Sequence, residues 1–229
     1  MRIKILGTRG EIHATGPKHL MHSGVLIDEM ILLDIGEKTF LKYKPQYIFI
    51  THLHPDHAFF MTPGTEIITD ATVFAPENSE KLKKMKLISK AIEIAGYRIT
   101  PVHVTHSLKV KSVAYLVEKG NKRIFYSGDI ASIDEKYFKR LRRLDLIITE
   151  ASFLRKGGLI RKNKQGKIFG HNGVPDLVNL FEKFTGRIVF THFGTWFLKD
   201  ISSGIQKIKS MEKNGLNLDI AVDGAEFEI

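Results

Sequence analysis

The sequence predicts an α/β fold in which two β-sheets pack face to face with helices outside them, an αββα sandwich. Apolar segments of strand length recur through both halves of the chain, and the predicted helices fall between groups of strands. A regular alternation of one strand and one helix would instead favour a single parallel sheet. No repeat, low-complexity tract or Pro- or Ser-rich linker divides the 229 residues. We therefore expect one domain, residues 1–229.

The first half is predicted to consist mainly of short strands joined by turns. Asp28-Glu29 separates two apolar segments and is typical of a hairpin turn. Residues 77–95 have helical spacing, with apolar side chains from Leu82 to Ala95, and Gly96 would end that helix. The predicted strands are residues 2–6, 23–27, 30–34, 45–51, 66–69 and 72–75, and the predicted helices are residues 38–42 and 77–95.

In the second half the helices become more frequent. Gly120-Asn121 marks a turn between two strands. The predicted strands are residues 98–104, 113–118, 123–127, 146–149, 187–191, 218–222 and 226–229, and the predicted helices are residues 135–144, 174–184 and 201–213. In this half, three helices thus separate four groups of strands, which is the pattern expected of a two-sheet sandwich.

The composition is that of an ordinary globular protein, with 43% hydrophobic residues. No apolar stretch approaches the length of a membrane span, and the first residues are too polar for a signal peptide. The chain contains no cysteine, so any metal must be held by His, Asp or Glu. We expect a cytoplasmic protein that does not bind a membrane.

The formal net charge is +10, from 35 Lys and Arg against 25 Asp and Glu. Such an excess favours an anionic partner, such as a nucleic acid or a phosphate ester. A chain rich in Lys and Ile and free of Cys is also typical of proteins from hot environments. The total charge does not decide between these two explanations.

The densest group of metal-type ligands lies in Thr51-His52-Leu53-His54-Pro55-Asp56-His57, directly after the apolar segment 47–50. On an extended chain His52 and His54 would point to the same side. Pro55 would end the strand, and the following turn would bring Asp56 and His57 back to the same place. Imidazole and carboxylate groups bind Zn²⁺, Mn²⁺ and Fe. The alternative is a strand end that is rich in His without any metal.

Polar residues of ligand type also follow other apolar strands directly. They are Asp34, His106, Asp129, Glu150 and His192. Strand ends are where α/β folds place their chemistry. An Asp after a strand is often only a turn former, but the whole set in this order predicts one composite site.

These residues resemble the five motifs of the metallo-β-lactamase superfamily, in order and over nearly the whole chain. That resemblance implies the αββα fold and two metal ions in a cleft. By position, the first ion would be held by His52, His54 and His106, the second by Asp56, His57 and His192, with Asp129 bridging both. Asp34 would hydrogen-bond a ligand imidazole. The ions would be zinc by preference, with manganese or iron as alternatives.

The chemistry that this resemblance implies is hydrolysis by a water that bridges the two ions. Asp56 would help to orient or deprotonate that water. Within the superfamily, Thr149-Glu150-Ala151-Ser152 and Gly170-His171-Asn172 resemble two motifs of ribonuclease Z, the tRNA 3′-processing endonuclease. By that resemblance Glu150 and His171 would form a pair in which His171 protonates the leaving alkoxide. A helix-entry role for His171 is the alternative.

A basic segment leads to His171. Residues 151–175 carry Arg155, Lys156, Arg161, Lys162, Lys164 and Lys167 and no acidic residue. Arg155, Lys156, Arg161 and Lys162 are candidates for gripping a phosphate backbone, and His22 is a further candidate for substrate contact. A solvated hairpin without a partner is the alternative. A second basic cluster lies on a predicted helix, and we expect it to be a solvent-exposed face without a partner. It consists of Lys139, Arg140, Arg142 and Arg143.

We therefore predict a dinuclear metal-dependent hydrolase, a phosphodiesterase or ribonuclease Z-like nuclease that acts on RNA or a nucleotide. Only about twenty residues separate His106 from Asp129, too few for a long tRNA-gripping arm there, and Thr149 stands where ribonuclease Z has His. A phosphodiesterase of short nucleotides therefore fits equally well. The alternatives are a carboxylic-ester, lactone or thioester hydrolase, and a nucleic-acid-binding protein with a non-catalytic metal site. A homodimer is compatible with the sequence.

Overall fold

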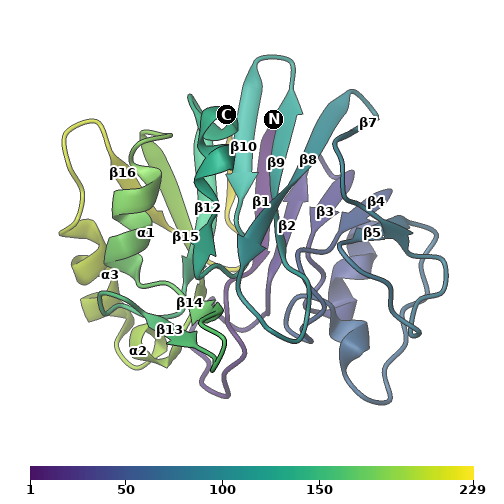
Figure 1. Cartoon of the computed structure of the whole chain (residues 1–229), viewed down its shortest axis with the longest axis horizontal. Helices are drawn as coiled ribbons and strands as arrows, with labels where there is room; N and C mark the ends of the chain where they lie inside the picture. Colours follow the sequence, from purple (N-terminus) through teal and green to yellow (C-terminus); the bar gives the residue numbers. More distant parts are fainter.

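Two large β-sheets pack face to face in the structure, a computed structural model that describes residues 1–229 (Figure 1). The first sheet has the order β17 (Glu226–Glu228), β1 (Arg2–Gly7), β2 (Gly24–Ile27), β3 (Ile31–Leu33), β4 (Tyr47–Phe49), β5 (Thr72–Ala75) and β6 (Lys86–Leu87). The second has the order β11 (Ser132–Ile133), β8 (Tyr97–Thr105), β9 (Val113–Lys119), β10 (Lys122–Tyr126), β12 (Leu146–Ala151), β15 (Arg187–Phe193) and β16 (Asn217–Ile220), and β7 (Ile92–Ile94) pairs with β8.

Helices lie outside both sheets. The 3₁₀ helices η1 (Lys38–Tyr43) and η2 (Phe59–Met61) pack on the first sheet through Phe40, Phe59 and Phe60. The second sheet is covered by η3 (Glu135–Leu141), α1 (Val174–Phe181), α2 (Thr195–Leu198) and α3 (Ile201–Lys209). In Figure 1, α1 and α3 lie at the left, beyond the strands β12 and β15. The predicted αββα sandwich is confirmed.

Alternation along the strands produces three apolar layers. In β12, Leu146 and Ile148 point into the core between the sheets, whereas Ile147 points to the core under the helices. In β3, Leu33 faces the other sheet, and Leu32 packs on the outer face with Phe40. Strands buried on both faces have unbroken apolar sequences, which explains why these segments could be recognised from sequence alone.

The strand directions bring the predicted site residues to one edge. Strands β3, β4 and β5 are parallel to each other, as are β10, β12 and β15. β8 and β10 are both antiparallel to β9, so they too run in the same direction. The carboxyl ends of β8, β10, β12 and β15 therefore meet at one edge of the second sheet.

Two sequence predictions were wrong. Residues 77–95 form turns and the strands β6 and β7, and residues 66–69 form no strand. Met85 and Ile88 are buried, but irregular backbone and not a helix places them there. Ala95 and Gly96, with φ of 49° and 79°, make the two-residue turn that joins β7 to β8. Gly96 thus ends a hairpin turn and not a helix, because φ > 0 at both central positions is what such a turn needs.

The boundaries of other elements also differ. The strand predicted at residues 45–51 is β4, which ends at Phe49, and the helices predicted at 135–144, 174–184 and 201–213 end earlier, at Leu141, Phe181 and Lys209. Helix α2 and a separate two-stranded sheet of β13 (Leu159–Lys162) and β14 (Ile168–His171) were not predicted as elements. None of the helices combines the length and apolar character needed to cross a membrane.

Candidate metal centre

The seven side chains that the sequence offered as ligands lie together at the strand ends. They form two groups in which all candidate ligand atoms lie within 4.8 Å of one another: His52, His54, His106 and Asp129 in the first, and Asp56, His57, Asp129 and His192 in the second. Asp129 belongs to both groups. The loop after β4 supplies four of the residues, and β8, β10 and β15 lead to the other three.

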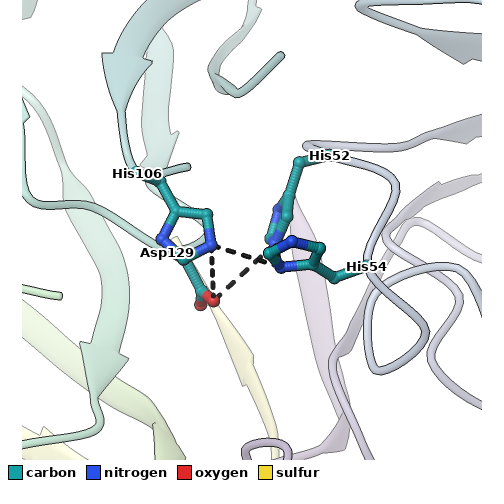
Figure 2. Close-up of side chains that lie close together, drawn as sticks. All are labelled: His52, His54, His106 and Asp129. Carbon is teal, nitrogen blue, oxygen red and sulfur yellow. Dashed lines mark hydrogen bonds and ion pairs between the residues drawn. The ribbon is translucent and has the colours of Figure 1, made fainter. Parts of the chain in front are cut away.

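The first group presents three imidazoles and one carboxylate oxygen to a common point (Figure 2). His54 Nδ1 lies 3.1 Å from His52 Nε2 and 3.3 Å from His106 Nε2. Asp129 Oδ2 lies 3.7 Å from His52 Nε2 and 3.6 Å from His106 Nε2. His54 thus offers its Nδ1 atom to this point, whereas the other two imidazoles offer Nε2.

The second group uses the other oxygen of the shared carboxylate. Asp129 Oδ1 lies 3.3 Å from both His57 Nε2 and His192 Nε2. Asp56 Oδ2 lies 3.5 Å from His57 Nε2 and 2.9 Å from His192 Nε2. Each oxygen of Asp129 therefore faces one group, which is the arrangement that a bridging carboxylate requires.

Both groups fit divalent metal ions. Ligands at about 2.1 Å around a tetrahedral ion lie about 3.4 Å from one another, and the distances above cluster around that value. Asp56 Oδ1, His57 Nε2 and Asp129 Oδ1 are buried and make no hydrogen bond. Buried polar atoms are normally satisfied, so three such atoms in one cluster indicate a ligand that completes them.

The protonation preferences of the two groups differ. Burial lowers the pKa of His52, His54 and His106, which favours the neutral imidazole that binds a metal. Burial also opposes a charge on His57 and His192, but the carboxylates of Asp129 and Asp56 outweigh it and raise their pKa. The second group thus favours a positive charge at its centre.

Asp34 fixes the ring of His57 from behind. Its Oδ2 atom lies 2.7 Å from His57 Nδ1 and accepts hydrogen bonds from the hydroxyl groups of Thr51, at 2.9 Å, and Tyr126, at 2.8 Å. Its Oδ1 atom accepts from the backbone N–H of Thr51 at 2.7 Å. Asp34 is fully buried among these partners, and it leaves His57 Nε2 as the nitrogen that faces the centre.

Two further hydroxyl groups, which sequence reasoning did not single out, orient ligand rings. Ser152 Oγ lies 2.9 Å from His192 Nδ1, and Thr51 Oγ1 lies 3.0 Å from His52 Nδ1. Gly128 is required beside Thr51, because its φ is +55° and a Cβ atom there would lie 2.8 Å from Thr51 Oγ1. Ser and Thr next to a ligand motif have no distinctive spacing, so only the structure could identify these roles.

Glu150, which is buried, and His171, which is partly buried, form a pair beside the first group. His171 Nδ1 lies 2.8 Å from Glu150 Oε2, and the other carboxylate oxygen accepts from the backbone N–H of Ile130 at 2.7 Å. Burial would lower the pKa of His171, but the carboxylates of Glu150 and Asp129 outweigh it and raise that pKa to about 9. His171 is the last residue of β14 and precedes α1, so the predicted pair and the helix entry are both present.

A cavity of about 330 Å³ opens onto these groups. It is lined by His54, Asp56, His106, Asp129, His171 and His192, together with Gly10, Glu11, Ile12, Ser152, Phe153, Gly194, Thr195 and Trp196. Trp196 reaches the cavity, whereas Phe197 is buried in the core. Glu11 and Ile12 come from the loop between β1 and β2, for which the sequence carries no recognisable motif.

The sequence also matches a known family model over residues 41–193, which is more than half of the chain, and that family is described as the β-lactamase superfamily domain. The chain belongs to this superfamily. No curated protein sequence matches the chain.

Solved structures of this fold align with the superfamily member described here over nearly its whole length. The metallo-β-lactamase fold protein YhfI from Bacillus subtilis has a TM-score of 0.70 at 16% identity and covers 99% of this chain and 98% of its own. A diphosphatase from the PhnP family has a TM-score of 0.66 at 17% identity and covers 100% and 97%. Human tRNase Z, short form, has a TM-score of 0.64 at 19% identity and covers 100% and 99%.

The predicted substrate-binding residues of this β-lactamase superfamily chain lie outside the cavity. His22 lines an adjacent cavity of about 790 Å³ that shares Asp56 with the first, and its Nδ1 atom lies 2.7 Å from Glu37 Oε1. Arg155, Lys156, Arg161 and Lys162 are exposed on or beside the β13–β14 hairpin. The structure therefore does not place these four cations at the metal centre.

Proposed function

We propose that the protein is a dinuclear metal-dependent phosphodiesterase, a hydrolase of the β-lactamase superfamily. The observation that carries this proposal is the Glu150–His171 pair, in which the buried Glu150 holds His171, a residue that lines the same cavity as five of the candidate metal ligands. Two metal ions and a positioned general acid are what the cleavage of a phosphodiester with a poor leaving group needs.

The first group would hold one ion and the second group the other, with Asp129 bridging them. We propose that the ions are zinc, which His and Asp ligands bind. Manganese and iron fit the same ligands and are the alternatives. Bound ions would polarise the phosphoryl oxygens and lower the pKa of a water molecule toward neutrality.

The side chains of the protein supply the remaining steps. Glu150 holds His171 Nδ1 at 2.8 Å and fixes the ring, so that Nε2 is the nitrogen that donates a proton to the leaving oxygen. Asp56 reaches the second group through Oδ2 at 2.9 Å from His192 Nε2, and its unpaired Oδ1 is the atom that orients the attacking water. Trp196 and Phe153 bound the cavity and limit the access of bulk water.

We infer that the substrate is RNA or a nucleotide, as for a ribonuclease Z-like nuclease. The net charge of +10 and the basic segment before His171 support an anionic substrate. The names of two structural neighbours, a diphosphatase and a tRNase Z, are in line with a phosphate-bearing substrate.

The test is a substrate panel with protein whose metal content has been measured by elemental analysis. The panel holds bis-p-nitrophenyl phosphate, a short RNA, a carboxylic ester, a lactone and a thioester, each also assayed with Asp129→Asn as the matched control. We expect turnover of the phosphodiesters by the wild type and a loss of that turnover in the variant. Turnover of the ester, lactone or thioester alone would contradict the proposal, as would RNA binding without turnover of any substrate.

A further inference from the structure

We propose that the β13–β14 hairpin is a binding arm for single-stranded nucleic acid, and that it leads such a strand to the cavity beside His171. In Figure 1 the two strands lie below the second sheet, at the lower edge of the molecule and near α2. They form a separate two-stranded sheet that pairs with neither large sheet.

The charge of this arm is not compensated within the protein. Its six cations are exposed and form no ion pair: Arg155, Lys156, Arg161, Lys162, Lys164 and Lys167. Elsewhere, cations with acidic neighbours are paired, as Arg123 is with Glu118 at 2.9 Å and Lys213 with Glu182 at 2.6 Å. A basic strip whose cations form no ion pair is what attracts a phosphate backbone.

The strand register places an aromatic ring and a cation in line with His171. Leu159 pairs with His171 and Arg161 pairs with Phe169, so these four side chains share one face of the hairpin. Two residues along a strand span about 7 Å, so Phe169 and Arg161 lie one such step from His171. An aromatic side chain on which a base stacks, beside a cation for the phosphate, is the usual platform for a single strand.

The base of the arm is fixed to the metal centre. Gly170 N–H donates to the carbonyl oxygen of His106 at 2.6 Å, and Asn172 N–H donates to that of Ile130 at 2.8 Å. In addition, His106 Nδ1 lies 3.1 Å from the carbonyl oxygen of Gly170. A single-stranded nucleic acid bound on the arm would therefore enter the cavity at a defined place.

The cavity and the arm complement each other. No Lys or Arg lines the cavity of about 330 Å³, so among its side chains His171 and bound metal ions would have to supply the positive charge that a phosphate meets there. Any neighbouring phosphates of a longer substrate must be bound outside the cavity, and the arm is a basic surface that joins the cavity at His171. Delivery of the nucleic acid to the cavity rests on the proposed phosphodiesterase function, whereas binding of the nucleic acid to the arm does not.

The experiment is fluorescence anisotropy with a labelled single-stranded oligonucleotide and the metal-loaded protein. The test variant is Arg161→Gln/Lys162→Gln/Lys164→Gln, and the control with the same charge change is Lys139→Gln/Arg140→Gln/Arg142→Gln on and beside η3. We expect the Kd of the test variant to rise more than about tenfold, with a salt slope smaller by about 0.7 for each lost phosphate contact. The control should stay within about twofold of the wild type.

Phe169→Ala gives a second, uncharged test. Loss of one stacked base costs about 1–3 kcal/mol, so its Kd should rise about 5- to 150-fold, and Phe169→Tyr should restore most of the affinity. Equal losses in the two charge variants would overturn the inference. Hairpin-dependent binding of phosphatidylserine vesicles without oligonucleotide binding would also overturn it.

The outcomes also separate this inference from the proposed function. If bis-p-nitrophenyl phosphate is hydrolysed but the wild type does not bind the oligonucleotide, the proposed binding role of the arm is contradicted and the proposed phosphodiesterase function is supported. Hairpin-dependent binding without hydrolysis of any phosphodiester would support the arm and contradict the phosphodiesterase.

Discussion

His171 differs from the neighbouring imidazoles in what it contacts. Its Nδ1 atom lies 2.8 Å from Glu150 and 3.8 Å from Asp129 Oδ2, whereas the nitrogens of the ligand imidazoles converge on one another and on Asp129. One histidine of the cluster is thus paired with a carboxylate that belongs to neither metal group. Such a pair can hold a proton for transfer and leaves the other histidines as the candidate metal ligands.

Replacing His171 by Ala should therefore slow only the cleavage of poor leaving groups. We expect a loss of about 10²–10⁴-fold in kcat for an alkoxide leaving group, since general acids contribute that much, and little change for p-nitrophenolate. The measurement is kcat for a series of diesters with leaving groups of rising pKa. An equal loss across the series would contradict the acid role, and unchanged metal content serves as the control.

Asp34 gives a second prediction at this scale. Asp34→Asn keeps the shape of the side chain but removes the charge beside His57 Nδ1, so the basicity of that ligand falls. We expect metal affinity to drop about 10- to 100-fold, as for other groups that hydrogen-bond a ligand imidazole. Competition with a fluorescent chelator measures it, and Asp28→Asn, a substitution far from the centre, is the control. Unaltered affinity would contradict the role of Asp34.

Sequence reasoning found the residues with a distinctive pattern. His52 and its neighbours, and Asp34 or Asp129 after apolar strands, could be recognised because ligand types followed strands that are buried on both faces. Ser152 could not be recognised, because its contact with His192 joins residues 40 positions apart. The left-handed backbone of Asp34 and His192, with φ of 57° and 50°, also carries no sequence signature.

At the scale of elements, the β2–β3 turn provides a pH-dependent link between the two sheets. Asp28 lies in this turn of the first sheet and accepts from the Arg2 backbone N–H at 2.7 Å, from Lys119 Nζ at 2.7 Å and from the Tyr97 hydroxyl. Partial burial would raise its pKa, but the hydrogen bonds from Lys119, Tyr97 and Arg2 outweigh this and lower the pKa to about 2.

The sign of the effect on stability follows from that shift. Because the pKa of Asp28 is lower in the folded protein than the ordinary 3.8, its stabilisation is present above about pH 4 and is lost as the pH falls toward 2. Asp28→Asn should lower the free energy of unfolding by about 1 kcal/mol at pH 7, allowing for solvent screening, and by less near pH 2. Urea unfolding at several pH values measures the difference.

Glu29→Gln in the same turn is the matched control. Glu29 is exposed and its ion pair with Arg2 is 3.3 Å long, so this substitution should change stability by less than about 0.5 kcal/mol. If the free energy of unfolding of Asp28→Asn stayed below that of the wild type by the same amount from pH 7 to pH 2, the destabilisation would not arise from the charge of Asp28. That result would contradict the explanation.

The elements that sequence reasoning missed have physical causes as well. In residues 77–95, apolar side chains recur at a spacing of three and four, and Met85 and Ile88 are buried without a helix; periodicity alone cannot separate this from a helix. The β13–β14 hairpin has no buried residue in either strand, and its sequence is rich in cations and glycines, which is typical of a loop. Strand β12 was found because its burial on both faces demands an unbroken apolar sequence.

At the scale of the whole molecule, the candidate metal centre draws its side chains from both sheets. In the first group, His52 and His54 follow a strand of the first sheet, whereas His106 and Asp129 follow strands of the second. The second group likewise takes two residues from the loop after β4 and two from the second sheet. Each bound ion would thus join both layers of the sandwich at one edge.

Metal removal should therefore destabilise the whole fold and not only the site. An ion present at 100 times its Kd stabilises the folded state by about 2.7 kcal/mol, and 1 kcal/mol corresponds to about 2–4 °C in Tm for a chain of this size. We expect a chelator to lower Tm by at least about 5 °C, and restored metal to reverse this. Asp129→Asn, which weakens both groups, should lose this metal-dependent difference, whereas Asp28→Asn should keep it. A Tm that is unchanged after elemental analysis has verified metal loss would mean that the apolar core between the sheets, and not the metal centre, holds this edge closed.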